Sequence, residues 1–371
     1  MTPETPVPGG RRRQTPPPGS RRRESTTLGY LPPVREPRFS PTVVRRTAVA
    51  TCVLAFLIGT AAAATAVVAT PLPGWVSRAG AVVLVVLYAV VLTYRAGGRL
   101  AVWPPLVVVL TAVALTTDIA WALSMLAVVT GVLAAVLAVV ITRPAVQTWR
   151  VIGEFTLAVA IGLSGALAVA AWNAPVVYQR FAILVLALSL VLTFAIVWSL
   201  GAGLHGLGQR GFLLIVGGGL LMTLVLVYSS AVRAYGSPVV VESLDGAFAW
   251  MRDTIGGVPR PAQFLLGLPA LVWGIGTRAD RRQGWWMCAF GVVGTATMTT
   301  QLVSADAVPS YIGLSELYSI VLGLLIGLLV RRIDPGTRRR GASAGAGGSR
   351  ARRDEPETVI RPEPERTRPL K

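Results

Sequence analysis

Charged side chains are scarce in this chain of 371 residues: they make up 14% of it, whereas hydrophobic residues make up 53%. Soluble domains are nearer a quarter charged, so the composition indicates an integral membrane protein. Histidine occurs once, at His205, and cysteine only twice, at Cys52 and Cys288. These numbers disfavour zinc or haem sites built from histidine, serine–histidine catalysis and a disulfide framework. We expect no metal, no cofactor and no enzymatic activity.

Two motif classes are missing as well. The chain has no Walker A sequence, so it is not itself an ATPase. The first expected outer loop, residues 71–78, has none of the acidic residues that a polyprenyl-sugar glycosyltransferase would carry there. Lysine occurs once, at Lys371, and arginine fills every other basic position, a bias typical of a high-GC bacterial genome. We therefore place the protein in a bacterial cytoplasmic membrane.

Long apolar stretches follow one another through residues 47–330, and about 20 apolar residues suffice to cross a bilayer as a helix. The pattern predicts an all-α, polytopic bundle of about ten transmembrane helices. Asp118 marks a tight turn between the third and fourth spans. The expected spans are 47–70, 80–94, 100–115, 119–142, 151–172, 178–204, 212–232, 261–276, 285–303 and 311–330.

Arginine accumulates at alternate connections between these spans. One side receives Arg95, Arg143 and Arg278 with both chain ends, whereas the connection between the ninth and tenth spans carries no positive charge. Positive residues remain on the cytoplasmic side of a membrane protein, so both termini are expected in the cytoplasm. The net charge of +18 is concentrated in the tails and these connections, which favours anionic lipid over nucleic acid as its partner.

Residues 1–46 and 331–371 are rich in arginine, proline and small residues. Neither segment has enough apolar side chains to offset the entropy of an ordered chain, so both are expected to be disordered cytoplasmic tails. They either fix the topology and keep the protein soluble, or bind anionic lipid at the inner membrane surface.

The expected outer loop, residues 233–260, contains apolar residues at spacings of three and four, including Leu244, Phe248 and Met251. That spacing predicts an amphipathic helix. The helix either lies at the membrane surface as a connection between two spans or acts as a gate over an outward-facing cavity.

Polar residues gather at the outer ends of the ninth and tenth spans. Thr299, Gln301 and Glu316 form a candidate polar cavity, because an ionisable residue at membrane depth is a functional candidate. The alternative is that the hydroxyls bond to carbonyl groups of their own helix. The eighth span is interrupted by Gly267 and Pro269, and discontinuous helices often mark a transporter's substrate site.

Small residues recur at every fourth position of the last span, at Ser315, Ser319, Gly323 and Gly327. Such a stripe lets two membrane helices approach closely and predicts a packing seam. Its partner is either another helix of this chain or a second copy in a homo-oligomer.

These patterns favour a non-catalytic carrier, or flippase-like component, for a small or lipidic envelope molecule. The alternative is a scaffold that binds other membrane proteins of envelope biogenesis or division through its tails and helix faces. A membrane-embedded enzyme ranks third.

Overall fold

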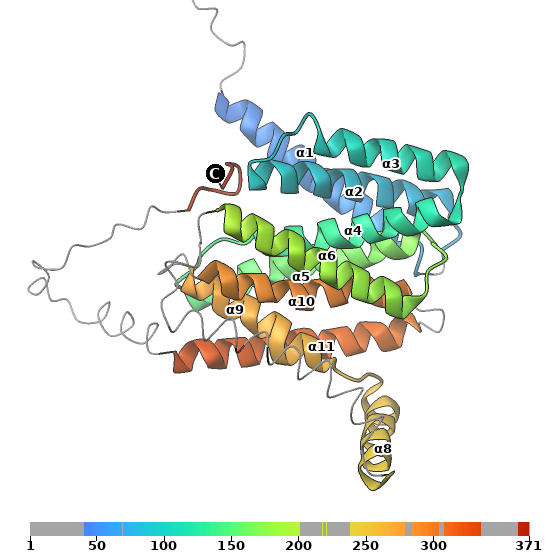
Figure 1. Ribbon diagram of the computed structural model, residues 1–371, viewed down its shortest axis with the longest axis vertical. Coiled ribbons are helices and arrows are strands. Elements are labelled where there is room, and N and C mark those ends of the chain that lie inside the picture. Colours follow the sequence, from blue (N-terminus) through green and yellow to red (C-terminus); the bar gives the residue numbers. More distant parts are fainter. Residues whose placement is uncertain are drawn as a thin grey trace, which may run out of the picture. The chain divides into compact units, whose positions relative to one another are not determined.

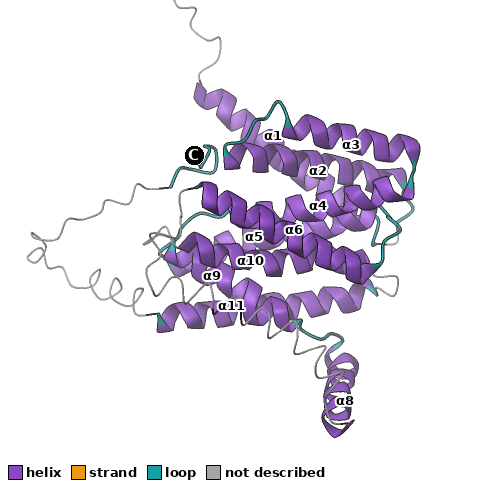
Figure 2. Ribbon diagram, in the orientation of Figure 1, coloured by secondary structure: helices purple, strands orange, loops and turns teal. Residues whose placement is uncertain are grey.

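The computed structural model describes residues 41–68, 70–200, 217, 220, 238–278, 284–303, 308–334 and 363–370. Within those ranges the chain forms helices joined by short connections, and no strand (Figure 2). Residues 1–44 and 45–371 form two separate compact units. In the first, the structure describes only the start of the first helix, and the rest of the description concerns the second unit.

The helices follow in the order shown in Figure 1. Their bounds are α1 Pro41–Ala64, α2 Trp75–Ala96, α3 Trp103–Thr117, α4 Ala120–Val140, α5 Thr148–Ala171, α6 Tyr178–Ser199, α8 Pro238–Ile255, π-helix η2 Ala262–Gly267, α9 Leu268–Thr277, α10 Gly284–Thr300, 3-10 helix η3 Gln301–Val303 and α11 Pro309–Ile333.

Six of these helices are long and apolar enough to cross a membrane: α1, α2, α4, α5, α6 and α11. Helix α3 and the continuous η2–α9 segment are shorter apolar helices. The predicted class, a helical multi-pass membrane protein, is confirmed at this level. The number of about ten spans and the orientation of the termini stay predictions. The expected seventh span, 212–232, lies outside the described residues apart from positions 217 and 220.

The turn expected at Asp118 is present, with a left-handed backbone of φ 48° between α3 and α4. Asn173, between α5 and α6, has the same φ. Asp and Asn tolerate this conformation because their short polar side chains bond locally. The first helix starts earlier than its hydropathy predicts. Helix α1 begins at Pro41, and proline suits a first helical position because its missing N–H has no intrahelical partner there.

The core of the second unit is formed by α4, α5 and α10, with α6 beside them and α9 and α11 following on one side (Figure 1). Helix α4 is the most buried of the six long apolar helices. In its apolar stretch 78% of the residues are buried, against 11% in that of α1. Hydrogen bonds between side chains also join helices inside this bundle. Trp172 Nε1 donates to Thr130 Oγ1 at 2.9 Å, and the Tyr88 and Ser164 hydroxyls are 2.7 Å apart.

Successive helices run between two opposite ends. We call the end that carries Arg95, Arg278 and Arg331 the basic end. Residues 363–370 belong to the tail for which disorder is expected, and that expectation stays a prediction for the tail as a whole. They form a turn at the basic end, where the N–H of Leu370 donates to the carbonyl of Arg95 at 2.9 Å (Figure 1). Hydrogen bonds and ion pairs, rather than apolar burial alone, hold this segment.

Candidate functional site

A carboxylate and two amide side chains meet at the end opposite the basic end. Glu316 of α11 is 2% exposed, and the side chains of Gln263 in η2 and Gln301 in η3 are buried as well. The amide nitrogen of Gln263 donates a short hydrogen bond to Glu316 Oε1. Gln301 is a second hydrogen-bonding neighbour of the same carboxylate. We call these three residues the polar cluster.

The polar cluster lies at membrane depth if α11 spans the bilayer. Glu316 is seven residues after Pro309, the first residue of α11. At a rise of 1.5 Å per residue, it lies about 10 Å along the helix. Arg260 is the charged residue that interacts electrostatically with Glu316. Its backbone N–H donates to Ser319 Oγ, on the same helix as Glu316. The cluster therefore holds an acid inside the helix bundle with one cation in its vicinity.

A π-helix positions Gln263. Pro269 lacks an N–H and its ring would clash with the carbonyl four residues earlier, so a regular α-helix cannot run through it undisturbed. The chain widens just before it: the N–H of Leu268 donates to the carbonyl of Gln263, five residues back. π-Helices are rare and are frequent at functional sites. The irregularity predicted for this span is thus present, and it carries one residue of the polar cluster.

Three oxygen atoms of the polar cluster are buried without a hydrogen-bond donor among the described residues: Gln263 Oε1, Gln301 Oε1 and Glu316 Oε2. Buried polar atoms normally have a partner, because leaving one unsatisfied costs about 1–3 kcal/mol. The arrangement therefore offers acceptors to a proton, a cation or a polar group of a ligand.

The predicted seam on α11 lies against this same chain. Ser315 Oγ accepts the N–H of Val258 at 3.0 Å, and Ser319 Oγ accepts the N–H of Arg260 at 2.9 Å. The two seam glycines, Gly323 and Gly327, face Leu268 and Val272 of α9, where a Cβ atom on either glycine would lie 2.6 Å from the opposing side chain. The serines thus bind the backbone ahead of η2, while the glycines admit the side chains behind it.

Thr299 does not join the polar cluster. Its hydroxyl donates to the carbonyl of Ala296 at 2.9 Å, which is the helix-internal bond expected as the alternative. Its side chain packs toward Gly131 of α4 and Gly165 of α5. Of the three candidate residues, the structure brings Gln301 and Glu316 together and leaves Thr299 on another face of α10.

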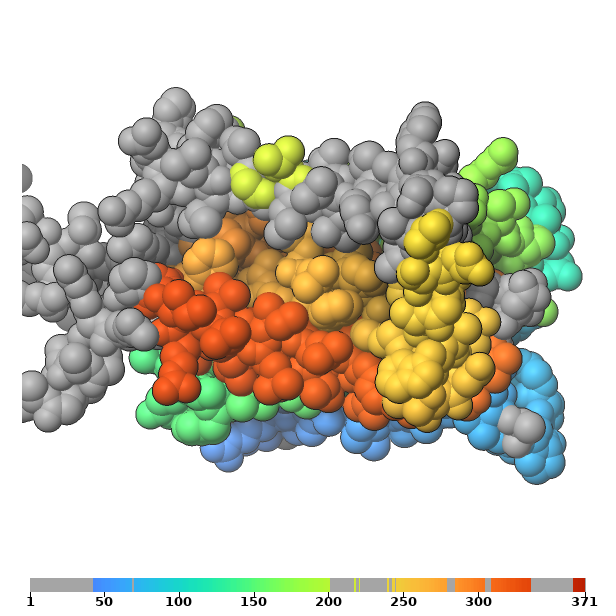
Figure 3. Space-filling model, turned by 90° about the horizontal axis from the view of Figure 1, so that it is seen from below, coloured from blue at the N-terminus to red at the C-terminus, as the bar shows by residue number. Residues whose placement is uncertain are grey.

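The predicted amphipathic helix exists as α8, seen against one end of α11 in Figure 3. Most described side chains of α8 are exposed; Phe248 is exposed, Met251 is half-buried, and the side chain of Leu244 lies outside the described set. Helix α8 is tied to α11 at its end, where the Tyr318 hydroxyl donates to the carbonyl of Ile255 at 2.8 Å. The gate role of these residues stays a prediction.

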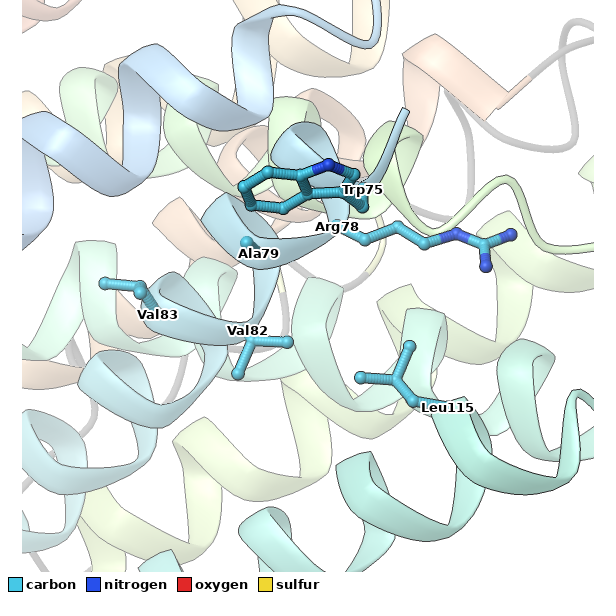
Figure 4. A pocket seen from close by; sticks show the side chains of 6 residues that line it. All are labelled: Trp75, Arg78, Ala79, Val82, Val83 and Leu115. Atoms are coloured by element: carbon cyan, nitrogen blue, oxygen red, sulfur yellow. The ribbon is translucent and has the colours of Figure 1, made fainter. Parts of the chain in front are cut away.

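A pocket of about 480 Å³ lies between α2 and α3, away from the polar cluster (Figure 4). Apolar side chains make up most of its wall, and the side chains of Trp75 and Arg78 lie at one edge. Its open form and its lining make it a surface hollow suited to a lipid chain rather than a polar site.

Gln263 was not among the residues that the sequence predicted for the site. The sequence does mark it, because Gln263 is the one residue with a side-chain amide in the apolar stretch 261–276. Gln263 lies seven residues after Gly256 and six before Pro269, but regular α-helical spacing from these residues does not show that it faces α11. The π-helix changes which side of the helix each residue faces.

No protein-family model, no curated protein and no solved structure matches this chain. The residues themselves therefore carry what can be inferred about function.

Proposed function

We propose that the protein is a carrier, or flippase-like component, for a small or lipidic envelope molecule, with the polar cluster as the polar position of its path. The observation that supports this is Glu316, an acid buried in an apolar helix against amide groups from two other segments. Burying an ionisable group in a membrane is costly, and such residues commonly belong to substrate or ion pathways. The π-helix beside it adds the kind of discontinuity seen at transporter sites.

In this proposal Glu316 acts as a switchable acceptor. Ionised, it attracts a cation or the cationic part of a substrate; protonated, it is a neutral donor that a lipidic molecule can pass. Gln263 and Gln301 orient the carboxylate in both states, because an amide can donate through its nitrogen and accept through its oxygen.

The test uses proteoliposomes that contain the full-length protein and a phosphatidylethanolamine labelled with NBD on an acyl chain, so that its headgroup keeps the cationic ammonium group. Translocation is read as the rate at which inner-leaflet label becomes accessible to dithionite. We expect the rate with the wild type to exceed that of protein-free vesicles. Glu316→Gln should slow it about tenfold, because the amide cannot ionise and loses the bond to the cationic headgroup, which contributes roughly 1.5–3 kcal/mol. Glu242→Gln, at an exposed position of α8, is the matched control and should leave the rate unchanged. A wild-type rate equal to that of protein-free vesicles would contradict lipid handling.

A membrane scaffold is the second candidate, and the packing of the core favours it. Large side chains such as Trp172, Tyr88 and Phe155 fill the centre of the described bundle. In that case the polar cluster stabilises the fold only, and Glu316→Gln changes stability without changing any translocation rate.

A further inference from the structure

The C-terminal residues 363–370 sit in a binding site at the basic end, and the centre of that site is Arg95. This arginine lies in the last turn of α2 and is 0% exposed. Its Nη1 donates to three backbone carbonyls of the segment: Glu365 at 2.7 Å, Arg368 at 2.9 Å and Pro364 at 3.2 Å. Three carbonyls converge on one guanidinium because the segment turns, with the N–H of Arg368 bonded to the carbonyl of Glu365 at 2.9 Å.

The last part of the segment is bound in the opposite sense. The N–H of Leu370 donates to the carbonyl of Arg95 at 2.9 Å. Arg95 therefore donates to the main chain of the segment through its side chain and accepts from it through its own carbonyl. The neighbouring Tyr94 hydroxyl donates to the carbonyl of Thr367 at 2.9 Å. The Leu370 side chain packs against the apolar core. Main-chain recognition and one apolar anchor are the devices by which domains bind short peptides.

Three of the segment's four charged side chains, Glu363, Glu365 and Arg366, each pair with a side chain of opposite charge. Glu363 pairs with the buried Arg278 at 3.4 Å. Arg366 pairs with Glu154 of α5 at 2.5 Å, whereas Arg45 and Glu365 form a half-exposed pair at 2.7 Å. The exposed pair contributes little because water screens it. The pairs with Arg278 and Glu154 are less accessible to water, so they define which sequence fits.

Arg278 is prepared for its partner. Its guanidinium donates to the carbonyl and the hydroxyl of Thr142, at 2.5 and 3.1 Å, and lies 3.9 Å from the centre of the Trp285 ring. A guanidinium held in this way loses little freedom on binding a carboxylate. Pro364 and Pro369 stiffen the segment, which lowers the entropy that docking costs.

We propose that the basic end carries a peptide-binding site and that residues 363–370 are its occupant, a C-terminal latch. The docked latch touches α1, α2, α5 and the end of α9, so it adds a connection between these helix ends while it is bound. The site recognises a turned peptide whose paired charged side chains follow the order acid, acid, base and which ends in an apolar side chain. This inference does not depend on whether the protein is a carrier or a scaffold.

Hydrogen–deuterium exchange of the full-length protein in nanodiscs tests the latch. The readout is the C-terminal peptide that covers residues 361–371. We expect its bonded amides, those of Arg368 and Leu370, to exchange about tenfold or more slowly than in a free synthetic peptide of the same sequence. Arg95→Ala should abolish this protection. Arg99→Ala, an exposed arginine one turn further along the chain, is the matched control and should preserve it.

A second variant lies in the latch itself, where it cannot disturb the folding of the helices. Arg366→Glu places a negative charge against Glu154 and should also release the peptide. Exchange of the wild-type peptide at the free rate would overturn the proposal. Full protection in both Arg95→Ala and Arg366→Glu would overturn it as well, because the contacts named here would then not hold the segment.

Discussion

Gln263 and Glu316 are 53 residues apart in the chain, yet the amide of the first donates to the carboxylate of the second inside the bundle. The contact links a π-helix to a spanning helix whose other contacts are mostly apolar or made by small residues. Its strength is open to direct measurement, because both partners can be truncated one at a time and together.

A double-mutant cycle of Gln263→Ala and Glu316→Ala measures this contact. We expect a coupling free energy of about 1–2 kcal/mol, near the upper end of interhelical hydrogen bonds in membrane proteins, because the acceptor is an acid. Unfolding of the purified protein in detergent, by heat or denaturant, supplies the four stabilities. Purely additive losses would show that the two side chains do not stabilise each other.

The glycine positions of α11 allow a comparison within one helix. Gly323→Ala should destabilise the protein by about 1–3 kcal/mol, because the added methyl group meets the Leu268 side chain in a packed interface. Gly313→Ala is the matched control: a Cβ atom there meets nothing within 4 Å, and alanine favours a helix over glycine by about 0.5–1 kcal/mol. Thermal unfolding of both variants checks the opposite signs. Equal effects would mean that α11 and α9 do not pack through this seam.

The arginine pattern predicts which connections face the cytoplasm. Leu100→Cys and Thr117→Cys place exposed thiols at the two ends of α3. In intact cells an impermeant maleimide should label the cysteine at position 117 and should reach position 100 only after permeabilisation. A variant with Cys52 and Cys288 replaced by alanine supplies the background. The reverse labelling order would place both termini outside.

Hydropathy located the helices well, because a spanning helix needs a long apolar run wherever it sits. The third and fourth spans end and begin around Asp118, as their composition predicts, and α11 covers the expected tenth span. Hydropathy does not separate an enclosed helix from a peripheral one. Helices α4 and α1 are both strongly apolar, yet only α4 is mostly buried.

The candidate site was predicted in part. Gln301 and Glu316 stand out as polar residues within apolar runs, so composition alone identifies them. Thr299 stands out equally, but its partners depend on which face of α10 meets α4 and α5. Gln263 and the C-terminal latch escaped prediction because their contacts join segments far apart in the chain, and nothing in a local pattern records such a pairing.

The π-helix also makes the span from Val258 to Val272 sensitive to its exact length. Backbone groups before it meet Ser315 and Ser319, and the side chains of Leu268 and Val272 after it meet the glycines of the seam. Each residue of a regular helix turns the chain by about 100°. Adding one residue between Pro261 and Leu268, beyond the one that the π-turn already takes up, would therefore turn everything downstream away from α11 by that angle, although composition and hydropathy would hardly change. In this segment the count of residues carries as much structural information as their identity.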